Sequence, residues 1–307
     1  MRALAPLMAA LVLAACPGEG DGGQPAASGP RTSFDGQKAY QYVQAQLAFG
    51  PRVPGTDGHR RAGDWMVERL RASADTVAEQ AWTHTTADGT RLPMRNVLAR
   101  FNPQAAERVL YLAHWDTRPV ADGESDAAKR TLPIPGANDG ASGVAMLLAL
   151  ADALKAERPS QGVDILLVDG EDYGDFDRDR DVFIGSRYFA EHLPAPGYRP
   201  IFGVLWDMVG DRDLQIYQEQ NSVSAAPEVV ARVWREAESL GYGRVFIPQV
   251  KHSINDDHIP LLRAGLRVID VIDFDFDHHH KLTDNLAMVS AASLQVVGDV
   301  AMALVTR

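Results

Sequence analysis

Acidic and histidine side chains follow several apolar runs of this sequence, at the positions where buried strands would end. With the preceding run in parentheses, they are His114 and Asp116 (109–113), Asp169, Glu171 and Asp172 (165–168), Asp207 (202–206), and His278, His279 and His280 (268–272). In an open α/β sheet, side chains at the carboxyl ends of strands converge on one crevice. Histidines and carboxylates together bind borderline divalent ions, zinc first. The pattern therefore predicts a metalloenzyme.

The adjacent acids Glu171 and Asp172 give the strongest local signal. Two carboxylates at the end of a buried strand repel each other, and the neighbouring sequence offers them no evident partner. A metal ion bound by Asp172 removes this repulsion. Glu171 is then left beside a cation without binding it, which is the position of a general base and acid.

Three further groups are candidates, each with a simpler alternative. Asp139 lies in the segment GANDGASG (136–143), where it could cap a helix or bind the metal, and the glycines allow close approach of the backbone. Asp207 ends an apolar strand and must pair with a cation or with donors. One Asp of the run 256–258 could cap a helix, and one of His278 to His280 is a ligand, although their spacing does not show which.

Alternating acids in the loop Asp175–Asp181 suggest a calcium site as an alternative function of that segment. The loop lacks the glycine and the terminal glutamate of the helix-loop-helix calcium pattern. Arg178 and Arg180 also neutralise part of its charge. We expect a solvated acidic loop.

Strands and helices are expected to alternate after residue 34. The predicted helices cover 34–49, 56–72, 139–157 (amphipathic), 183–192, 227–240, 256–264 and 290–305. The predicted strands cover 76–85, 96–101, 109–113, 163–169, 201–207, 214–217 and 267–272, the first two forming a hairpin around Asp88-Gly89. This order predicts a single α/β domain (34–307) with a mostly parallel, mixed central sheet and helices on both faces.

The N-terminal residues predict export. Arg2 and the short apolar stretch 4–15 lead into Leu13-Ala14-Ala15-Cys16, which resembles the bacterial lipoprotein cleavage box. We expect 1–16 to be a lipoprotein signal peptide, with Cys16 becoming the lipid-bearing end, although an ordinary secretory signal is the alternative. Residues 17–33, rich in Gly, Ala and Pro, would be a flexible tether. The predicted location is the periplasm or cell surface, with the membrane contacted only through that anchor.

Composition limits the partners and the ligand types. The 307 residues carry a formal charge of -11 and no cluster of Lys and Arg, which argues against nucleic acid as a partner. Cys16 is the only cysteine, so a metal site must use histidine and carboxylate. Nothing in the sequence indicates the oligomeric state.

Together these segments resemble the glutaminyl-peptide cyclotransferases of the animal and bacterial type, which share a fold group with the zinc aminopeptidases. The resemblance covers about residues 34–305. It rests on FGPRVPG (49–55), HWDTRP (114–119), GANDGASG (136–143), DGEDYG (169–174) and DDHIP (256–260), in that order.

The resemblance implies a zinc enzyme that cyclises an N-terminal glutamine of peptides or proteins to pyroglutamate and releases ammonia. The implied roles are zinc binding by Asp139, Asp172 and His280, proton transfer by Glu171, and an acidic hydrogen-bonded pair beside it formed by Asp207 and Asp257. His280 is chosen because the family's metal histidine lies five residues before an asparagine, here Asn285. His279 replaces a tryptophan found in many cyclotransferases, and Phe183 replaces one found in bacterial relatives; in this family both positions shape the substrate pocket.

A two-zinc aminopeptidase is the alternative. Its five ligands have counterparts here, with His114 and Asp207 completing a second metal site, and Glu171 would then activate water. The runs 256–260 and 115–119 favour the cyclotransferase with one zinc ion.

Overall fold

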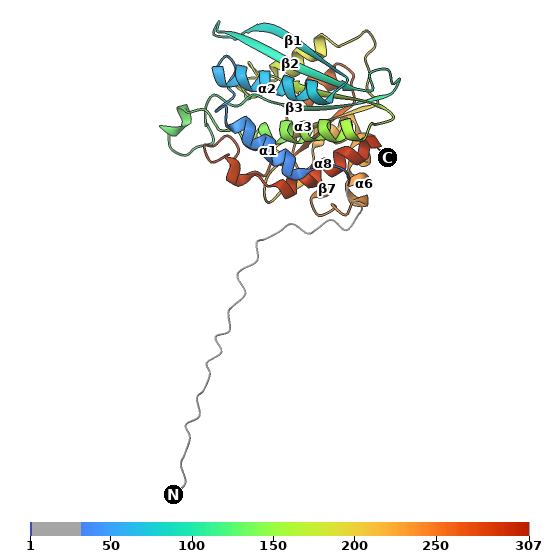
Figure 1. Cartoon of the computed structure of the whole chain (residues 1–307). Coiled ribbons are helices and arrows are strands. Elements are labelled where there is room, and N and C mark those ends of the chain that lie inside the picture. Colours follow the sequence, from blue (N-terminus) through green and yellow to red (C-terminus); the bar gives the residue numbers. More distant parts are fainter. Residues whose placement is uncertain (2–31, 307) are drawn as a thin grey trace.

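Helices and strands alternate in the computed structural model, which describes Met1 and residues 32–306 (Figure 1). The helices are α1 (Gly36–Leu47), α2 (Asp57–Ser73), α3 (Ala141–Ala156), α4 (Ile184–Glu191), α5 (Gln220–Ala225), α6 (Pro227–Ser239), α7 (His258–Arg263) and α8 (Ala291–Thr306), with the short 3-10 turns η1 (Lys129–Thr131) and η2 (Leu286–Met288). The strands are β1 (Thr76–Thr85), β2 (Arg91–Phe101), β3 (Arg108–His114), β4 (Gly162–Val168), β5 (Phe202–Asp207), β6 (Ile216–Gln218), β7 (Phe246–Val250) and β8 (Val268–Ile272).

The central sheet is mixed, with six strands in the order β1-β2-β4-β3-β5-β8. Strands β4, β3, β5 and β8 run parallel, whereas β2 and β1 continue the sheet antiparallel as the expected hairpin. The structure confirms the predicted single-domain α/β fold. The strand β2 begins at Arg91, five residues before its predicted start, because its first half pairs with β1 alone.

Helices cover both faces of this sheet. On one face, α1, α3 and α8 lie side by side, joined by α2 and α6, and their apolar side chains share one core with alternate residues of the strands (Figure 1). On the other face, α4 and α7 pack over Leu110, Leu112 and Leu166. Because the inner strands are covered on both sides, every residue of β3, β4, β5 and β8 is buried.

The helix α3 differs from its prediction in two ways. It begins at Ala141 rather than at Asp139, and Gly140 occupies its N-cap position. It is also buried on nearly every side rather than amphipathic, because it lies between the sheet and the pair α1 and α8. Asp139 therefore lies outside the helix and does not cap it.

Two elements were not predicted. The helix α5 has only six residues, too few to show a helical period, and β7 buries only Phe246 among its five. β7 pairs with β6 in a separate two-stranded parallel sheet. Hydrophobic periodicity detects elements with a buried face, so it could not predict these two.

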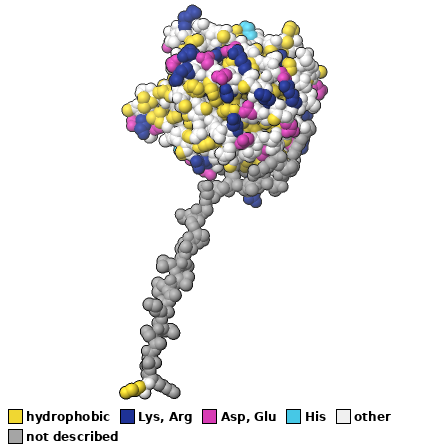
Figure 2. Space-filling model, in the orientation of Figure 1, with side chains coloured by type: hydrophobic (Ala, Val, Ile, Leu, Met, Phe, Trp, Pro, Cys, Tyr) yellow, Lys and Arg dark blue, Asp and Glu magenta, His cyan; other side chains and the backbone are white. Residues whose placement is uncertain are grey.

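The outer surface carries mixed charge. On the face shown in Figure 2, basic and acidic side chains are interspersed among apolar ones. Among residues 32–306, no helix combines the length and apolar composition that crossing a bilayer requires. The predicted signal peptide (1–16) and nearly all of the predicted tether (17–33) lie outside the described residues. The Thr32 N–H donates to Asp299 of α8 at 3.2 Å.

Candidate active site

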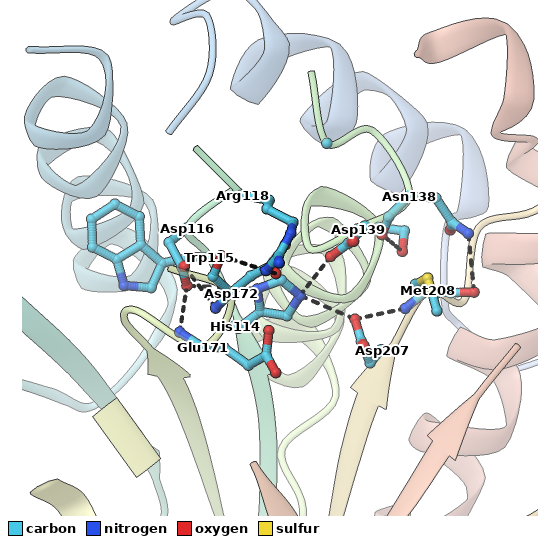
Figure 3. A network of polar contacts seen from close by, with 12 residues as sticks. His114, Trp115, Asp116, Arg118, Asn138, Asp139, Glu171, Asp172, Asp207 and Met208 are labelled. Carbon is cyan, nitrogen blue, oxygen red and sulfur yellow. Dashed lines mark hydrogen bonds and ion pairs between the residues drawn. The ribbon is translucent and has the colours of Figure 1, made fainter. Parts of the chain in front are cut away.

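Predicted site residues from four segments meet beyond the carboxyl ends of the parallel strands. His114 ends β3, Asp172 follows β4, Asp207 ends β5 and His280 lies between β8 and α8. Asp139, from the loop before α3, lies among them (Figure 3). Beside them lies a cavity of about 430 Å³ whose lining includes Asp139, Glu171, Asp207, Asp256, His279 and His280.

Two carboxylates and one imidazole lie close together at the predicted zinc site. His280 Nε2 lies 3.8 Å from Asp139 Oδ2 and 3.4 Å from Asp172 Oδ1. Asp139 Oδ2 and Asp172 Oδ2 are buried and accept no hydrogen bond from any described residue. Buried acceptors without donors are costly unless a cation satisfies them. This donor set therefore fits a zinc ion, since zinc takes imidazole nitrogen and carboxylate oxygen.

A second group lies directly beside the first, but its atoms already contact one another. His114 Nε2 is 3.1 Å from Asp139 Oδ1 and 3.2 Å from Asp207 Oδ1. The Met208 N–H also donates to Asp207 Oδ1, at 2.8 Å. Burial lowers the pKa of His114, but the surrounding carboxylates, led by that of Asp207, raise it well above its usual range. The His114 imidazole thus lies between the two acids, in a place where a second metal would also fit.

Glu171 is held by its backbone and leaves its carboxylate to the cavity. Asp116 Oδ1 accepts the Glu171 N–H at 3.1 Å, and its Oδ2 accepts the Asp172 N–H at 3.2 Å. The Glu171 side chain points away from Asp116 (Figure 3). Burial, and then the negative charge of Asp256, raise the pKa of Glu171 well above its ordinary value. A carboxyl group with a raised pKa is suited to accept a proton and return it.

Asp172 has a partner that sequence reasoning missed. Arg118 Nη1 donates to Asp172 Oδ1 at 2.8 Å, and the Arg118 side chain is only 7% exposed. The repulsion between Glu171 and Asp172 is therefore relieved in part by the protein itself. Arg118 belongs to HWDTRP (114–119), which directly follows a predicted strand. This position in the sequence could have indicated that the arginine lies near the site.

The prediction that Asp207 and Asp257 form a hydrogen-bonded pair is wrong. No described hydrogen bond joins these two residues. Asp257 is fully buried, accepts from Ser186 Oγ at 2.5 Å and does not line the cavity. Its neighbour Asp256 lines the cavity, and burial followed by the charge of Asp207 raises the pKa of Asp256 well above its usual range. The acid that faces Glu171 is therefore Asp256. A run of two acids does not reveal which one faces inward.

The histidine triplet divides into two residues at the site and one outside it. His280 and His279 line the cavity, with ring centroids 3.8 Å apart, and His279 Nε2 lies 3.9 Å from Asp139 Oδ2. His278 instead contacts Thr283 Oγ1 at 2.8 Å and is not among the lining residues. Asp139, His279 and His280 form one of the two groups of described side chains that could hold a metal ion, so His279 is itself a candidate ligand.

Two acids support the site from outside. Asp284 accepts the N–H groups of Asn138 and Asp139, at 2.8 and 3.2 Å, and so fixes the loop before α3. Asp169 was grouped with the strand-end acids, but it is buried against His59 at 2.8 Å and accepts the Arg95 N–H at 2.7 Å.

The acidic loop 175–181 makes local ion pairs. Asp175 pairs with Arg178 at 2.8 Å, Asp181 with His84 at 2.9 Å, and Asp179 with Arg187. The two groups of described side chains that could hold a metal ion both lie in the main site. The expectation of a solvated loop agrees with these contacts.

Comparisons with known proteins place this geometry in context. Residues 96–305 match the model of peptidase family M28. A glutaminyl-peptide cyclotransferase of Drosophila melanogaster is 27% identical over 268 residues, covering 79% of this chain and 73% of that protein. A glutaminyl cyclase of Bacteroides thetaiotaomicron, bound to N-acetylhistamine, has a TM-score of 0.86 at 35% identity over 90% of this chain and 99% of its own. A Zn-dependent exopeptidase of Parabacteroides distasonis has a TM-score of 0.87 at 35% identity, over 91% of this chain and all of its own.

Proposed function

The chain belongs to peptidase family M28, and within that family we propose that it is a zinc-dependent glutaminyl-peptide cyclotransferase. Its relatives and structural neighbours include glutaminyl cyclases of animals and bacteria. The observation that carries the proposal is which carboxylate oxygens of the site have a protein partner and which have none. Asp139 Oδ2 and Asp172 Oδ2 are buried and accept no hydrogen bond from a described residue, whereas Asp139 Oδ1 and Asp207 Oδ1 lie 3.1 and 3.2 Å from His114 Nε2. Because His114 already contacts two of these oxygens, the arrangement supports one zinc ion rather than two.

Asp139, Asp172 and His280 would hold the zinc ion. When bound, it supplies Lewis-acid polarisation of the side-chain amide carbonyl of the substrate glutamine. The acidic lining of the cavity, with Glu171, Asp207 and Asp256, favours the amino terminus of a peptide. A free N-terminus is therefore part of what the site recognises.

Glu171 carries the proton. The α-amine nitrogen bonds to the side-chain carbonyl carbon, and the Glu171 carboxylate accepts a proton from that nitrogen. The bond between this carbon and the amide nitrogen then breaks, and Glu171 returns the proton so that ammonia leaves. The products are a pyroglutamyl peptide and ammonia. Asp256, which faces Glu171, would hold the amine or the departing nitrogen by hydrogen bonds.

A two-zinc aminopeptidase is the second candidate. The cluster of His114, Asp139 and Asp207 could accept a second ion, and the exopeptidase neighbour shares the fold along its whole length. In that reaction Glu171 would take a proton from water instead of from the substrate amine. The contact of His114 with both acids makes this the less favoured function.

One incubation separates the two candidates. Purified protein with enough zinc to fill both candidate metal positions is given a glutamine-initiated peptide and a matched leucine-initiated peptide, and products are followed by mass spectrometry. Cyclisation gives loss of ammonia from the first and leaves the second intact, whereas release of leucine would identify the aminopeptidase. Glu171→Gln should bind zinc and lose turnover, with Glu228→Gln as the control, because Glu228 is an exposed acid paired with Arg267.

We also propose that the enzyme is an exported lipoprotein. The support for this is the sequence 13–16, ending in Cys16. The substrates would then be peptides or protein N-termini outside the cytoplasm.

A further inference from the structure

The far nitrogen of the metal histidine contacts a carboxylate outside the ligand set. His280 Nδ1 lies 3.1 Å from Asp122 Oδ1, while His280 Nε2 faces Asp172 and Asp139. We propose that Asp122 is a positioning residue for the zinc site, which accepts the Nδ1–H of His280 and thereby leaves the Nε2 lone pair for the metal. The inference rests on the zinc site of the proposed function and adds a residue that none of the sequence motifs contains.

Arg118 holds Asp122 in place and ties it to the ligand set. Its Nε donates to Asp122 Oδ1 at 2.9 Å and its Nη2 to Asp122 Oδ2 at 2.6 Å, a bidentate pair. The remaining Nη1 donates to Asp172 Oδ1 at 2.8 Å. The Arg118 guanidinium thus links Asp122, which contacts His280 Nδ1, to Asp172, which lies near His280 Nε2. Arginine suits this role because its fork of donors is planar and rigid.

The two residues that follow Asp122 contact the His280 loop at two more points. The Gly123 N–H donates to the His280 carbonyl at 3.0 Å, and the Leu282 N–H donates to Glu124 Oε1 at 3.0 Å. A Cβ on Gly123 would lie 2.7 Å from the His279 carbonyl oxygen, so only glycine allows this approach. His280 itself has a φ of 55°, a conformation that a residue with a side chain keeps only when its surroundings enforce it.

The contacts of Asp122 act mainly on the orientation of the His280 imidazole ring. The Asp122 side chain is 43% exposed, at the base of a surface loop, so it contributes little to the core. A hydrogen bond to the remote nitrogen of a metal-bound histidine selects its tautomer and fixes its plane. Loss of such a partner typically weakens metal binding by roughly 10–100-fold.

The test compares zinc affinity in Asp122→Ala, Asp122→Asn and the control Asp126→Ala. Asp126 is an exposed acid of the same loop that contacts only the loop backbone, at Ala128. Affinity is measured on the full chain by competition with a chromophoric chelator, and Co²⁺ is used as a spectroscopic probe. We expect Asp122→Ala to bind zinc roughly 10–100-fold more weakly. Asp122→Asn should fall between it and the wild type, because an amide oxygen still accepts Nδ1–H.

The control and the cobalt spectrum separate positioning from general destabilisation. The Co²⁺ absorption bands should shift in Asp122→Ala and remain unchanged in Asp126→Ala. The inference is overturned if Asp122→Ala binds zinc as tightly as the wild type, if the control loses as much affinity, or if Asp122→Asn binds more weakly than Asp122→Ala. If Asp122→Ala does not fold, the comparison of Asp122→Asn with the wild type decides, and equal affinity overturns the inference. A wild-type protein that binds no zinc would instead refute the proposed function.

Discussion

Replacing Glu219 by glutamine should destabilise the protein by about 3 kcal/mol at neutral pH. Glu219 precedes α5 and is 1% exposed. Its carboxylate accepts the N–H groups of Asn221, Ser222 and Ile254 at 2.8, 2.6 and 3.0 Å, and the Ser222 hydroxyl at 2.8 Å. His258 Nε2 lies 3.4 Å away. Glutamine keeps the shape but offers only one accepting oxygen, so some of these donors lose their partner.

The magnitude follows from the pKa of Glu219. Burial raises this pKa, but the nearby His258 ring and hydrogen bonds from the backbone more than offset burial and lower it from 4.5 to about 2. At roughly 1.4 kcal/mol for each pKa unit, the ionised form stabilises the fold by about 3 kcal/mol. Because the pKa is lowered on folding, this stability is present above pH 4.5 and is lost as the pH falls towards 2. A neutral glutamine resembles the protonated acid, so the variant lacks this contribution to stability at every pH.

Urea unfolding of the wild type and Glu219→Gln at several pH values measures the difference. The gap in unfolding free energy should be about 3 kcal/mol at pH 7 and narrow by about 1 kcal/mol at pH 3.5. Glu228→Gln is the matched control, since its partner Arg267 is exposed and such pairs contribute about 0–1 kcal/mol. Ile254 and its neighbour Asn255 line the cavity, so Glu219→Gln should also raise the KM for a glutamine-initiated peptide. A gap below about 1 kcal/mol at pH 7, or one that widens in acid, would refute this reasoning.

Four further predictions concern the site and the N-terminus. Asp256→Asn should lower kcat by roughly 100-fold without loss of zinc, because it removes a carboxylate facing Glu171. Asp257→Asn should mainly lower the unfolding temperature, and a larger loss of kcat in this variant would restore Asp257 as the reacting acid. Removing zinc with a chelator should stop turnover and lower stability by about 2.7 kcal/mol relative to protein at a zinc concentration 100 times Kd; titration back should saturate at one equivalent, and saturation at two would support the aminopeptidase. Cys16→Ser should move the protein from the membrane to the soluble fraction of cells, and an unchanged distribution would contradict the lipid anchor.

The sequence predicted the fold because its strong signals are local. Continuous apolar runs locate β3, β4, β5 and β8, and the residues just after them are brought together by topology. This reasoning predicts that Asp172, Asp207 and His114 lie near one another, as they do in the structure. The same logic could not predict α5 or β7, since neither presents a buried face long enough to show a period.

Within the site, sequence reasoning could identify segments but not always the side chain that acts. In the run Asp256-Asp257, the orientation depends on Ser186 of α4, which accommodates the second acid and leaves the first to the cavity. Arg118 and Asp122 contact their partners only because the loop 118–124 folds back over the His280 loop. Such pairings depend on three-dimensional approach across more than 50 residues, which carries no periodic signal.

The glycines before and within α3 restrict how this scaffold could be redesigned. A Cβ at Gly140 would lie 2.5 Å from the His114 carbonyl oxygen, and one at Gly143 would lie 2.1 Å from the Trp206 carbonyl oxygen. The loop and helix that present Asp139 are thus fitted directly against the ends of β3 and β5. A library that randomises 136–143 should return glycine at both positions whatever substrate is selected for. Room for new specificity lies instead at the rim, where Phe274 and Asp177 border the cavity and remain exposed to solvent.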